Sequence, residues 1–232
     1  MKILVIIPTY NERENIGKII PEVLKVTASD TEILVVDDNS PDGTSEIVRQ
    51  LGDKNHRVHL FLRSKKEGLG RAYLSGFQWG LEQKFDILIE MDADFSHRPE
   101  DLLSLIAQAK KSDFAIGSRY IEGGKTINWG ILRKLISKGG ALYSRLILGY
   151  PVRDWTGGFN AWNRRVLEQI GLANVQSNGY SFQIELKYRA LKLGFNGAEV
   201  PIVFEDRRVG QSKMSLKIVL EAFYRVWLIR KN

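Results

Sequence analysis

Short, continuously apolar runs alternate with longer segments of helical periodicity through the first 120 residues of this 232-residue chain. Runs such as ILVIIP and EILVVDD are apolar at nearly every position, which is typical of parallel strands covered by helices on both faces. The strands are predicted at residues 2–7, 32–36, 58–62, 86–90 and 114–116. The helices between them are predicted at residues 15–26, 44–51, 70–82 and 99–110. This order predicts an α/β fold with a mostly parallel, Rossmann-like sheet and helices on both faces.

The periodicity is looser after Tyr120, where Gly123 and Gly124 form a turn. Helices are predicted at residues 132–148, 180–193 and 214–228, and a single strand at residues 199–204. Since no repeat, low-complexity tract or linker interrupts the chain, we expect one domain over residues 1–212 and an appended amphipathic helix over residues 213–232. That helix is expected to pack on the core or to lie in a membrane interface, and packing is the default.

Composition and missing motifs exclude several functional classes. The chain has no cysteine, which removes disulfides, zinc fingers, iron–sulfur clusters and a thiol nucleophile together. A P-loop is disfavoured because EGLGRAYLSGF lacks the Gly-Lys-Ser/Thr ending, so its glycines are interpreted as packing residues. A Ser–His–Asp hydrolase is disfavoured because no G-x-S-x-G string follows a strand. We expect neither a signal peptide nor a membrane span, because no apolar run reaches roughly 18 residues.

The net charge of +7 is concentrated in one window. Residues 125–165 carry eight basic side chains against one acidic one, and the rest of the chain is close to neutral. A local excess of positive charge favours a polyanion, a phosphate group or an anionic membrane surface as partner. We expect no nucleic acid among the partners.

Two carboxylates follow the strand predicted at residues 86–90. Asp92 and Asp94 are separated by one small residue, Ala93. Ligands bind outside the carboxyl ends of the strands in open α/β sheets, and Mg²⁺ completes its coordination shell with water and substrate phosphates. The pair therefore predicts a divalent-metal site that also holds a nucleotide diphosphate. The alternative is that Asp94 or Ser96 caps the following helix.

Acidic and aromatic side chains also follow the first two strands. Tyr10 and Glu12 come after the first strand, and Asp38 comes after the second. A ring can stack on a nucleotide base, and a carboxylate can accept two hydrogen bonds from the N–H edge of guanine. Taken singly, each residue favours a structural role in a turn or at a helix start. Three acidic strand ends at one edge of the sheet together favour a nucleotide site.

Basic and hydroxyl side chains after the fifth strand predict a second anion site, separate from the metal. They are Arg119, Arg133, Lys134, Ser137 and Lys138. Arg133 and Ser137 share one helical face at a spacing of four residues, and guanidinium groups bind phosphate with two parallel hydrogen bonds. The alternative is an ordinary solvated basic helix. Further along the chain, Arg207 and Lys213 bracket the segment RVGQS, which is expected to fold over a bound diphosphate.

Six motifs occur in order between residue 2 and about residue 215: PTYNEREN, VVDDNSPDGT, KEGLGRAY, MDADFSH, GSRY and DRRVGQSK. Their order and spacing resemble the dolichyl-phosphate mannose synthase branch of glycosyltransferase family 2, whose members have the GT-A fold. The resemblance implies an inverting dolichyl-phosphate β-D-mannosyltransferase, which moves mannose from GDP-mannose to the phosphate of a polyprenyl or dolichyl carrier. It implies Mg²⁺ or Mn²⁺ as cofactor.

The resemblance also implies roles for individual residues. Nucleotide-sugar contacts would come from Pro8, Tyr10, Glu12, Val36, Asp38, Asp92, Ala93, Asp94, Arg119, Arg207 and Lys213. Asp92, Asp94 and Ser96 would hold the metal, although some relatives carry Gln at the position of Ser96. Arg119, Arg133 and Ser137 would bind the acceptor phosphate, and Asp92, Asp94 and Arg119 would form the catalytic set.

Other members of that family add transmembrane helices after the catalytic domain, whereas this chain stops at Asn232. We therefore expect a cytoplasmic protein that associates peripherally with the cytoplasmic face of a membrane, alone or through a membrane-anchoring subunit. Two alternatives remain open. One is a transferase that uses UDP-glucose or another nucleotide sugar with the same carrier. The other is a non-catalytic module that binds membranes or polyanions through residues 125–165.

Overall fold

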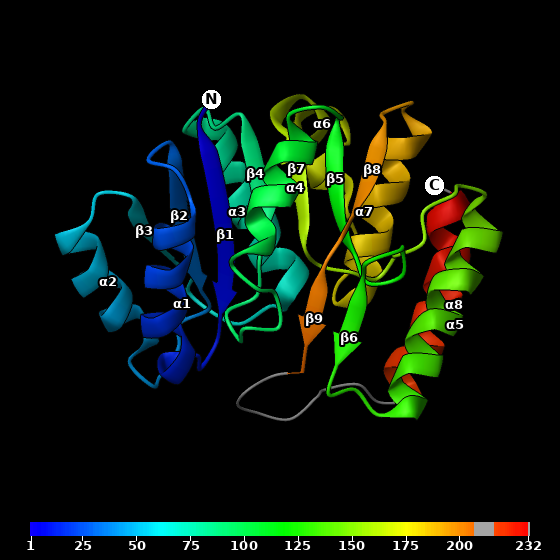
Figure 1. Ribbon diagram of the computed structural model, residues 1–232, viewed down its shortest axis with the longest axis horizontal. Coiled ribbons are helices and arrows are strands. Elements are labelled where there is room, and N and C mark those ends of the chain that lie inside the picture. The colour runs from blue at the N-terminus through cyan, green and yellow to red at the C-terminus, as the bar shows by residue number, and fades with distance from the viewer. Residues whose placement is uncertain (207–215, 232) are drawn as a thin grey trace.

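A seven-stranded sheet forms the centre of the protein in the computed structural model, which describes residues 1–206 and 216–231. The strands lie in the order β3-β2-β1-β4-β7-β5-β8 (Figure 1). Their bounds are Ile3–Thr9 for β1, Thr31–Asp37 for β2, Val58–Leu62 for β3, Ile87–Glu90 for β4, Phe114–Ser118 for β5, Asn160–Asn163 for β7 and Gly197–Pro201 for β8. All neighbours pair in parallel except β7, which is antiparallel to both β4 and β5. This confirms the predicted α/β, mostly parallel sheet.

Helices cover both faces of the sheet, because successive residues of a strand point to opposite sides. Leu4 and Ile6 of β1 pack with Tyr73, while Val5 and Ile7 pack with residues such as Ile16 in a second core. The first core receives α3 (Leu69–Glu82), α6 (Arg164–Gln169) and α7 (Tyr180–Lys192), and the short 3₁₀ helix Leu172–Asn174 follows α6. The second core receives α1 (Arg13–Val26), α2 (Thr44–Lys54) and α4 (Asp101–Ala109). The sheet is therefore buried on both sides, which explains its continuously apolar strands.

Glycine allows α3 to lie close to the sheet. A Cβ atom placed on Gly76 would come within 2.6 Å of Ile6 Cγ2, which is closer than real carbon atoms approach. This confirms the interpretation of the glycine-rich segment before and within this helix as a packing device.

The prediction of a single strand at residues 199–204 is wrong. The strand β8 ends at Pro201, and β9 (Val203–Glu205) pairs in parallel with β6 (Lys125–Ile127) in a separate two-stranded sheet. Ile202 connects the two sheets, since its N–H donates to the carbonyl of Ser118 and its carbonyl accepts from the N–H of Lys125. The chain therefore passes from pairing with β5 to pairing with β6 at Ile202. The apolar pattern continues through this residue, so the sequence does not show where one strand ends and the next begins.

The helices α5 (Ile131–Leu148) and α8 (Leu216–Lys231) lie side by side next to α7 (Figure 1). Val226 and Ile229 of α8 are buried, and the hydroxyl of Tyr143 donates to the carbonyl of Phe223 over 3.2 Å. These contacts confirm the expected packing of the last helix on the core. The expected division between residues 212 and 213 lies outside the described residues and stays a prediction. None of the described helices combines the length and the apolar character needed to cross a bilayer.

Candidate active site at the carboxyl edge of the sheet

The predicted site residues that follow the strands β1, β2, β4 and β5 lie at one edge of the sheet, the lower edge in Figure 1. The strands β1, β2, β4 and β5 run in the same direction, so that the loops after them gather at their carboxyl ends. The inserted strand β7 runs the opposite way between β4 and β5. Its amino end therefore lies at this edge as well, and it brings the preceding DWTGG segment beside the strand ends.

The loop after β4 holds Asp92 and Asp94 in a fixed geometry. The main-chain N–H of Asp92 donates to His97 Nδ1 over 3.0 Å, and the carboxylate of Asp94 accepts the N–H of Ser96 over 3.0 Å. Phe95, between Asp94 and Ser96, has a φ of 62°, a left-handed conformation that is unusual for a bulky residue. Such strain is typical of functional loops. The alternative that Asp94 or Ser96 caps a helix is wrong, because α4 begins later, at Asp101.

Ser96 provides the observation that favours a metal at this loop. Its side chain is buried, and its hydroxyl has no hydrogen-bond partner within the described part of the chain. Two carboxylates and a hydroxyl are oxygen ligands of the kind that Mg²⁺ and Mn²⁺ prefer. No group of three acidic or histidine side chains forms a metal cage among residues 1–206 and 216–231. The donor set therefore fits an ion that completes its shell with water and substrate phosphate.

His97 supports the metal loop, although its spacing in the sequence suggests no ligand partner. Burial lowers the pKa of His97 to about 4, against the opposing charge of Asp94, so the imidazole is neutral near pH 7. Its Nδ1 accepts from Asp92, which places the ring proton on Nε2. The ring stacks on Phe159 at a centroid distance of 4.7 Å. His97 thus joins the loop after β4 to the chain before β7.

The residues predicted to contact the base lie beside two cations that the sequence analysis missed. The ammonium group of Lys66 lies 3.7 Å from the centre of the Tyr10 ring. Arg63 donates to the Asp38 carboxylate over 2.5 Å and to Glu67 over 2.7 Å. Burial raises the pKa of Asp38, although Arg63 opposes this shift. The basic run RSKK after the third strand was the available signal for both cations.

Other predicted nucleotide contacts have structural partners. The carboxylate of Glu12 accepts from the Asn15 amide over 2.8 Å at the start of α1. Val36 is fully buried, and Ala93 is nearly so. Pro8 lies opposite Val36 in the register of β1 and β2. The helix-start interpretation is confirmed for Glu12, and the nucleotide contacts stay predictions.

Arg119 is held by a buried ion pair at the end of β5. Its Nε and Nη2 each donate to the Asp154 carboxylate over 2.7 Å, and Nη2 also donates to the Thr156 hydroxyl. Burial opposes ionisation of Asp154, but the Arg119 guanidinium outweighs it and lowers the pKa of this carboxyl. Two of the three guanidinium nitrogens of Arg119, Nε and Nη2, therefore donate to Asp154 and Thr156.

A second buried cation lies beneath this pair. The ammonium group of Lys187 donates to the main-chain carbonyls of Asp154, Trp155 and Gly157 over 2.7–3.1 Å. Burial lowers the pKa of Lys187 to about 8, against the opposing charge of Asp154. The sequence analysis missed Lys187 because a lysine within a helix is normally solvent-exposed. It fixes the main chain that carries Asp154.

Arg133 and Ser137, the predicted acceptor-phosphate residues, lie on α5 with partners of their own. Arg133 Nη1 donates to the Asp206 carboxylate over 2.7 Å, and the guanidinium carbon lies 4.0 Å from the centre of the Trp129 ring. The Tyr120 hydroxyl donates to the Ser137 hydroxyl over 2.6 Å. Arg207 and Lys213, predicted to bind the donor, lie outside the described residues.

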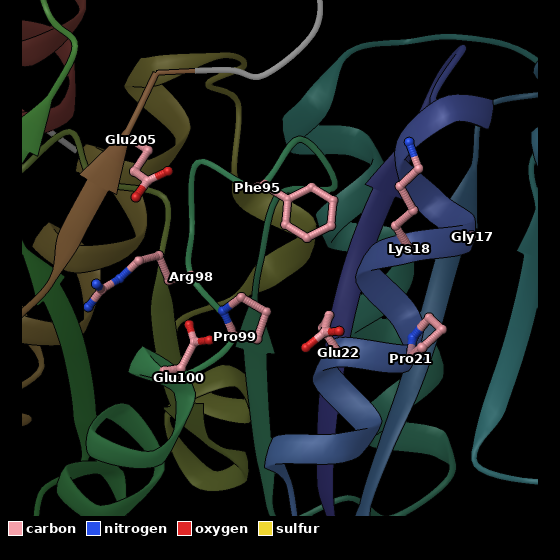
Figure 2. A pocket seen from close by; sticks show the side chains of 9 residues that line it. All are labelled: Gly17, Lys18, Pro21, Glu22, Phe95, Arg98, Pro99, Glu100 and Glu205. Atoms are coloured by element: carbon pink, nitrogen blue, oxygen red, sulfur yellow. The ribbon is translucent and has the colours of Figure 1, made fainter.

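A cleft of about 690 Å³ lies between α1 and the loop after β4. Figure 2 shows the side chains that line it, which are Gly17, Lys18, Pro21, Glu22, Phe95, Arg98, Pro99, Glu100 and Glu205. None of them is among the predicted site residues, and the carboxylates outnumber the cations. This cleft is therefore a poor match for an anionic diphosphate, and the candidate site is the neighbouring group of strand ends.

Comparison with known proteins agrees with this geometry. The family model described as glycosyl transferase family 2 matches residues 4–171, which include β1, β2, β4 and β5 and the loops after them. The chain is a member of glycosyl transferase family 2. The fold is of the GT-A type, with a mostly parallel central sheet.

Three curated relatives of this family-2 chain are named for mannose transfer to lipid phosphates. Polyprenol monophosphomannose synthase of Mycolicibacterium smegmatis is 49% identical over 98% of this chain and 87% of its own length. Undecaprenyl-phosphate mannosyltransferase of Micrococcus luteus is 44% identical over 97% of this chain and 93% of its own length. Dolichol-phosphate mannosyltransferase of Pyrococcus furiosus is 38% identical over all of this chain and 64% of its own length.

Solved structures with the same fold are much less similar in sequence. Glucosyl-3-phosphoglycerate synthase from Mycobacterium tuberculosis, in complex with Mg²⁺ and UDP, has a TM-score of 0.73 at 17% identity, over 99% of this chain and 79% of that one. A complex of the same enzyme with Mn²⁺, UDP and glucosyl-3-phosphoglycerate has a TM-score of 0.69 at 18% identity, over 98% and 78%. These likenesses confirm the GT-A fold.

Proposed function

We propose that this chain is an inverting transferase that moves mannose from GDP-mannose to the phosphate of a polyprenyl phosphate, with Mg²⁺ or Mn²⁺ as cofactor. The observation that carries the proposal is the loop after β4, where Asp92, Asp94 and the partnerless hydroxyl of Ser96 lie together. The names of the curated relatives support mannose as the sugar and a polyprenyl phosphate as the acceptor. The identity of the donor nucleotide rests on the motif resemblance.

The residues divide the chemistry between two sites. Asp92, Asp94 and Ser96 would hold the metal, which would supply positive charge to offset the charge of the leaving GDP. Arg133 and Ser137 would bind the acceptor phosphate. One phosphate oxygen forms a bond to the anomeric carbon as the bond from that carbon to GDP breaks, and GDP leaves with the electron pair. The attacking oxygen belongs to an anion near pH 7, so no catalytic base is required.

The transfer is tested with radiolabelled GDP-mannose and undecaprenyl phosphate in detergent, with Mg²⁺ or with EDTA. We expect labelled lipid in the presence of Mg²⁺ and none with EDTA. A parallel reaction contains labelled UDP-glucose. Labelling from UDP-glucose alone would overturn the donor assignment, and labelling from neither would support the non-catalytic membrane-binding alternative.

The metal assignment is tested with Asp94→Asn. We expect this variant to lose transfer by about a hundredfold or more, because the site has few protein ligands, and to keep its melting temperature. Asp53→Asn, which alters an exposed carboxylate on α2, is the control and should keep wild-type activity. Transfer by Asp94→Asn close to that of Asp53→Asn would refute the metal role.

We further propose that the protein binds the cytoplasmic face of a membrane through α5 and α8. Large apolar side chains are exposed on these helices, and we call them the α5–α8 face: Ile131, Leu132, Leu135, Leu142, Leu146, Phe223, Tyr224 and Trp227. On α5 the spacing of 131, 135, 142 and 146 forms one stripe. Lys134, Lys138 and Arg145 flank this stripe, so the face combines apolar area with positive charge and fits an anionic bilayer.

The bilayer proposal is tested by co-sedimentation with vesicles. We expect binding to phosphatidylcholine vesicles that contain phosphatidylglycerol, and weaker binding to phosphatidylcholine alone. Leu142→Gln should reduce binding, whereas Leu193→Gln, which changes a side chain of similar exposure (54% against 57%) outside the α5–α8 face, should not. Equal effects of the two substitutions would refute the assignment. Dimerisation in place of vesicle binding would assign the face to a second copy of the chain.

A further inference from the structure

Two hydrogen-bond donors on neighbouring side chains are left without partners beside the acceptor-phosphate residues. They are Nε1 of Trp129 and Nε of Arg133, and neither has a hydrogen-bond partner in the part of the chain that the structure describes. The guanidinium carbon of Arg133 lies 4.0 Å from the centre of the Trp129 ring, so the two groups are in direct contact. Trp129 is only 7% exposed, which leaves little water to satisfy its N–H.

Unsatisfied buried donors are rare in native proteins, because losing water without gaining a partner destabilises the folded state. Two of them on side chains that pack together therefore indicate a ligand. The indole N–H and the guanidinium Nε are donors with no acceptor capacity. The missing partner must therefore present acceptor atoms, as the oxygens of a phosphate do.

The charges around the pair are compatible with an anion. Arg119 lies 5.4 Å from the Trp129 ring, and Asp206 accepts from Arg133 through Nη1, a different nitrogen from the partnerless Nε. Ser137 is one helical turn from Arg133. Lys138 lies 6.0 Å from the ring of Tyr120, which donates to Ser137. Asp206 and Asp154 are each paired with a guanidinium, and Lys138 adds a further positive charge.

We propose that Trp129 is a further binding residue for the acceptor, and that its indole N–H and Arg133 Nε donate to the phosphate oxygens of a polyprenyl phosphate. The inference rests on the proposed function, which assigns a phosphate acceptor to Arg133 and Ser137. It adds a neutral donor to that site and explains why a tryptophan, rather than another aromatic residue, lies there. No bond in the substrate changes through Trp129, so its role is to hold the nucleophilic oxygen in place.

A chain of aromatic contacts fixes Trp129 relative to the metal loop. Its ring meets the edge of Phe204 at 5.4 Å, and Phe204 meets His97 at 5.4 Å. His97 in turn accepts the N–H of Asp92. The acceptor oxygen would therefore be held at a set position from the group that binds the departing diphosphate, which is what an in-line displacement requires.

The first test is Trp129→Phe, which keeps an aromatic ring beside Arg133 and Phe204 but removes the N–H. We expect the KM for undecaprenyl phosphate to rise about tenfold, because a hydrogen bond to a charged group is lost. The KM for GDP-mannose should change less than about twofold. Thr31→Val is the control, since it removes a buried, partnerless hydroxyl at the opposite edge of the sheet, and both KM values should stay as in the wild type. Equal KM values for the lipid in Trp129→Phe and wild type would refute the proposal.

The second test uses the wild-type protein and does not depend on the folding of a variant. The chain has five tryptophans, and the indole N–H signal of Trp129 in a ¹⁵N spectrum is assigned from three-dimensional heteronuclear spectra of the wild-type protein. Titration with farnesyl phosphate should shift this signal, and farnesol should not. Inorganic phosphate should shift it at higher concentration, because it lacks the lipid tail.

The outcomes distinguish a failure of the proposed function from a failure of the role of Trp129. A wild-type protein that transfers no mannose to undecaprenyl phosphate would remove the proposed function and this inference with it. A wild-type protein that transfers mannose, with a Trp129 signal unmoved by saturating farnesyl phosphate, would overturn the inference alone. A shift with farnesol equal to that with farnesyl phosphate would replace phosphate recognition by contact with the lipid tail and would also overturn it.

Discussion

The buried pair of Arg119 and Asp154 allows a quantitative prediction about stability. Asp154 is fully buried and accepts four hydrogen bonds, two from the Arg119 side chain over 2.7 Å and two from the N–H groups of Arg119 and Gly157 over 2.9 Å. In Asp154→Asn one of the two oxygens becomes an NH₂ group, which cannot accept. The Arg119 and Lys187 cations then remain buried without their carboxylate. Removing one partner of a buried ion pair costs about 3–5 kcal/mol.

The loss is measured by urea denaturation followed by circular dichroism at pH 7.5. We expect a fall of about 3–5 kcal/mol in the free energy of unfolding, with a melting temperature lower by about 10 °C. The control is Arg49→Gln, which breaks an ion pair with Glu46 whose two side chains are half exposed or more. Such a surface pair contributes about 0–1 kcal/mol, so this variant should be close to wild type.

The activity of the same variant adds a second measurement. Below the melting transition, we expect Asp154→Asn to lower kcat, because Arg119 loses the carboxylate that orients it at the site. A loss of stability smaller than about 1 kcal/mol would refute the reasoning, since it would mean that the buried cations find other partners at little cost.

Three further predictions concern other parts of the site and the core. Ser96→Ala should leave stability unchanged or slightly higher, because it deletes a buried hydroxyl with no partner among the described residues, while the Mn²⁺ concentration needed for activity rises about tenfold. Burial lowers the pKa of His97 to about 4 from 6.5, so the folded state binds fewer protons between these pH values and its stability falls on acidification. Between pH 7.5 and 5 the free energy of unfolding should drop by about 2 kcal/mol more in wild type than in His97→Gln, as measured by urea denaturation. Gly80→Ala should destabilise by about 1–2 kcal/mol, because its Cβ would lie 2.5 Å from Leu88, whereas Gly139→Ala, with open space around it, should stabilise by up to about 1 kcal/mol.

At the end of β4 the two carboxylates were predictable from the sequence, but the residues that support them were not. The D-x-D string and its position after an apolar strand sufficed to predict Asp92 and Asp94 at the sheet edge, because parallel strands necessarily end together. Their supports were not predictable. His97 acts through an acceptor nitrogen on a main-chain N–H five residues back, and this depends on how the loop folds.

The strand β7 illustrates a different gap. Its four residues, NAWN, carry no alternation of polar and apolar positions that would identify a strand. This segment forms a strand because it pairs with β4 on one side and with β5 on the other. The Glu90 carboxylate also accepts hydrogen bonds from the side chains of Asn160 and Trp162. Burial raises the pKa of Glu90 to about 7, against these hydrogen bonds. Tertiary packing thus overrides weak local propensity.

The sequence by itself determined the order of strands and helices through residue 120, the acidic strand ends and the family, because each depends on local periodicity or on motifs that are contiguous in the chain. The tertiary structure alone decided which partners the charged residues have. Arg119 with Asp154, Arg133 with Asp206 and Asp38 with Arg63 are separated by 25 to 73 residues, and no local pattern links them. The pairs of Arg119 with Asp154 and of Arg63 with Asp38 are buried, and they form because burial makes an isolated charge costly, whereas the pair of Arg133 with Asp206 is partly exposed.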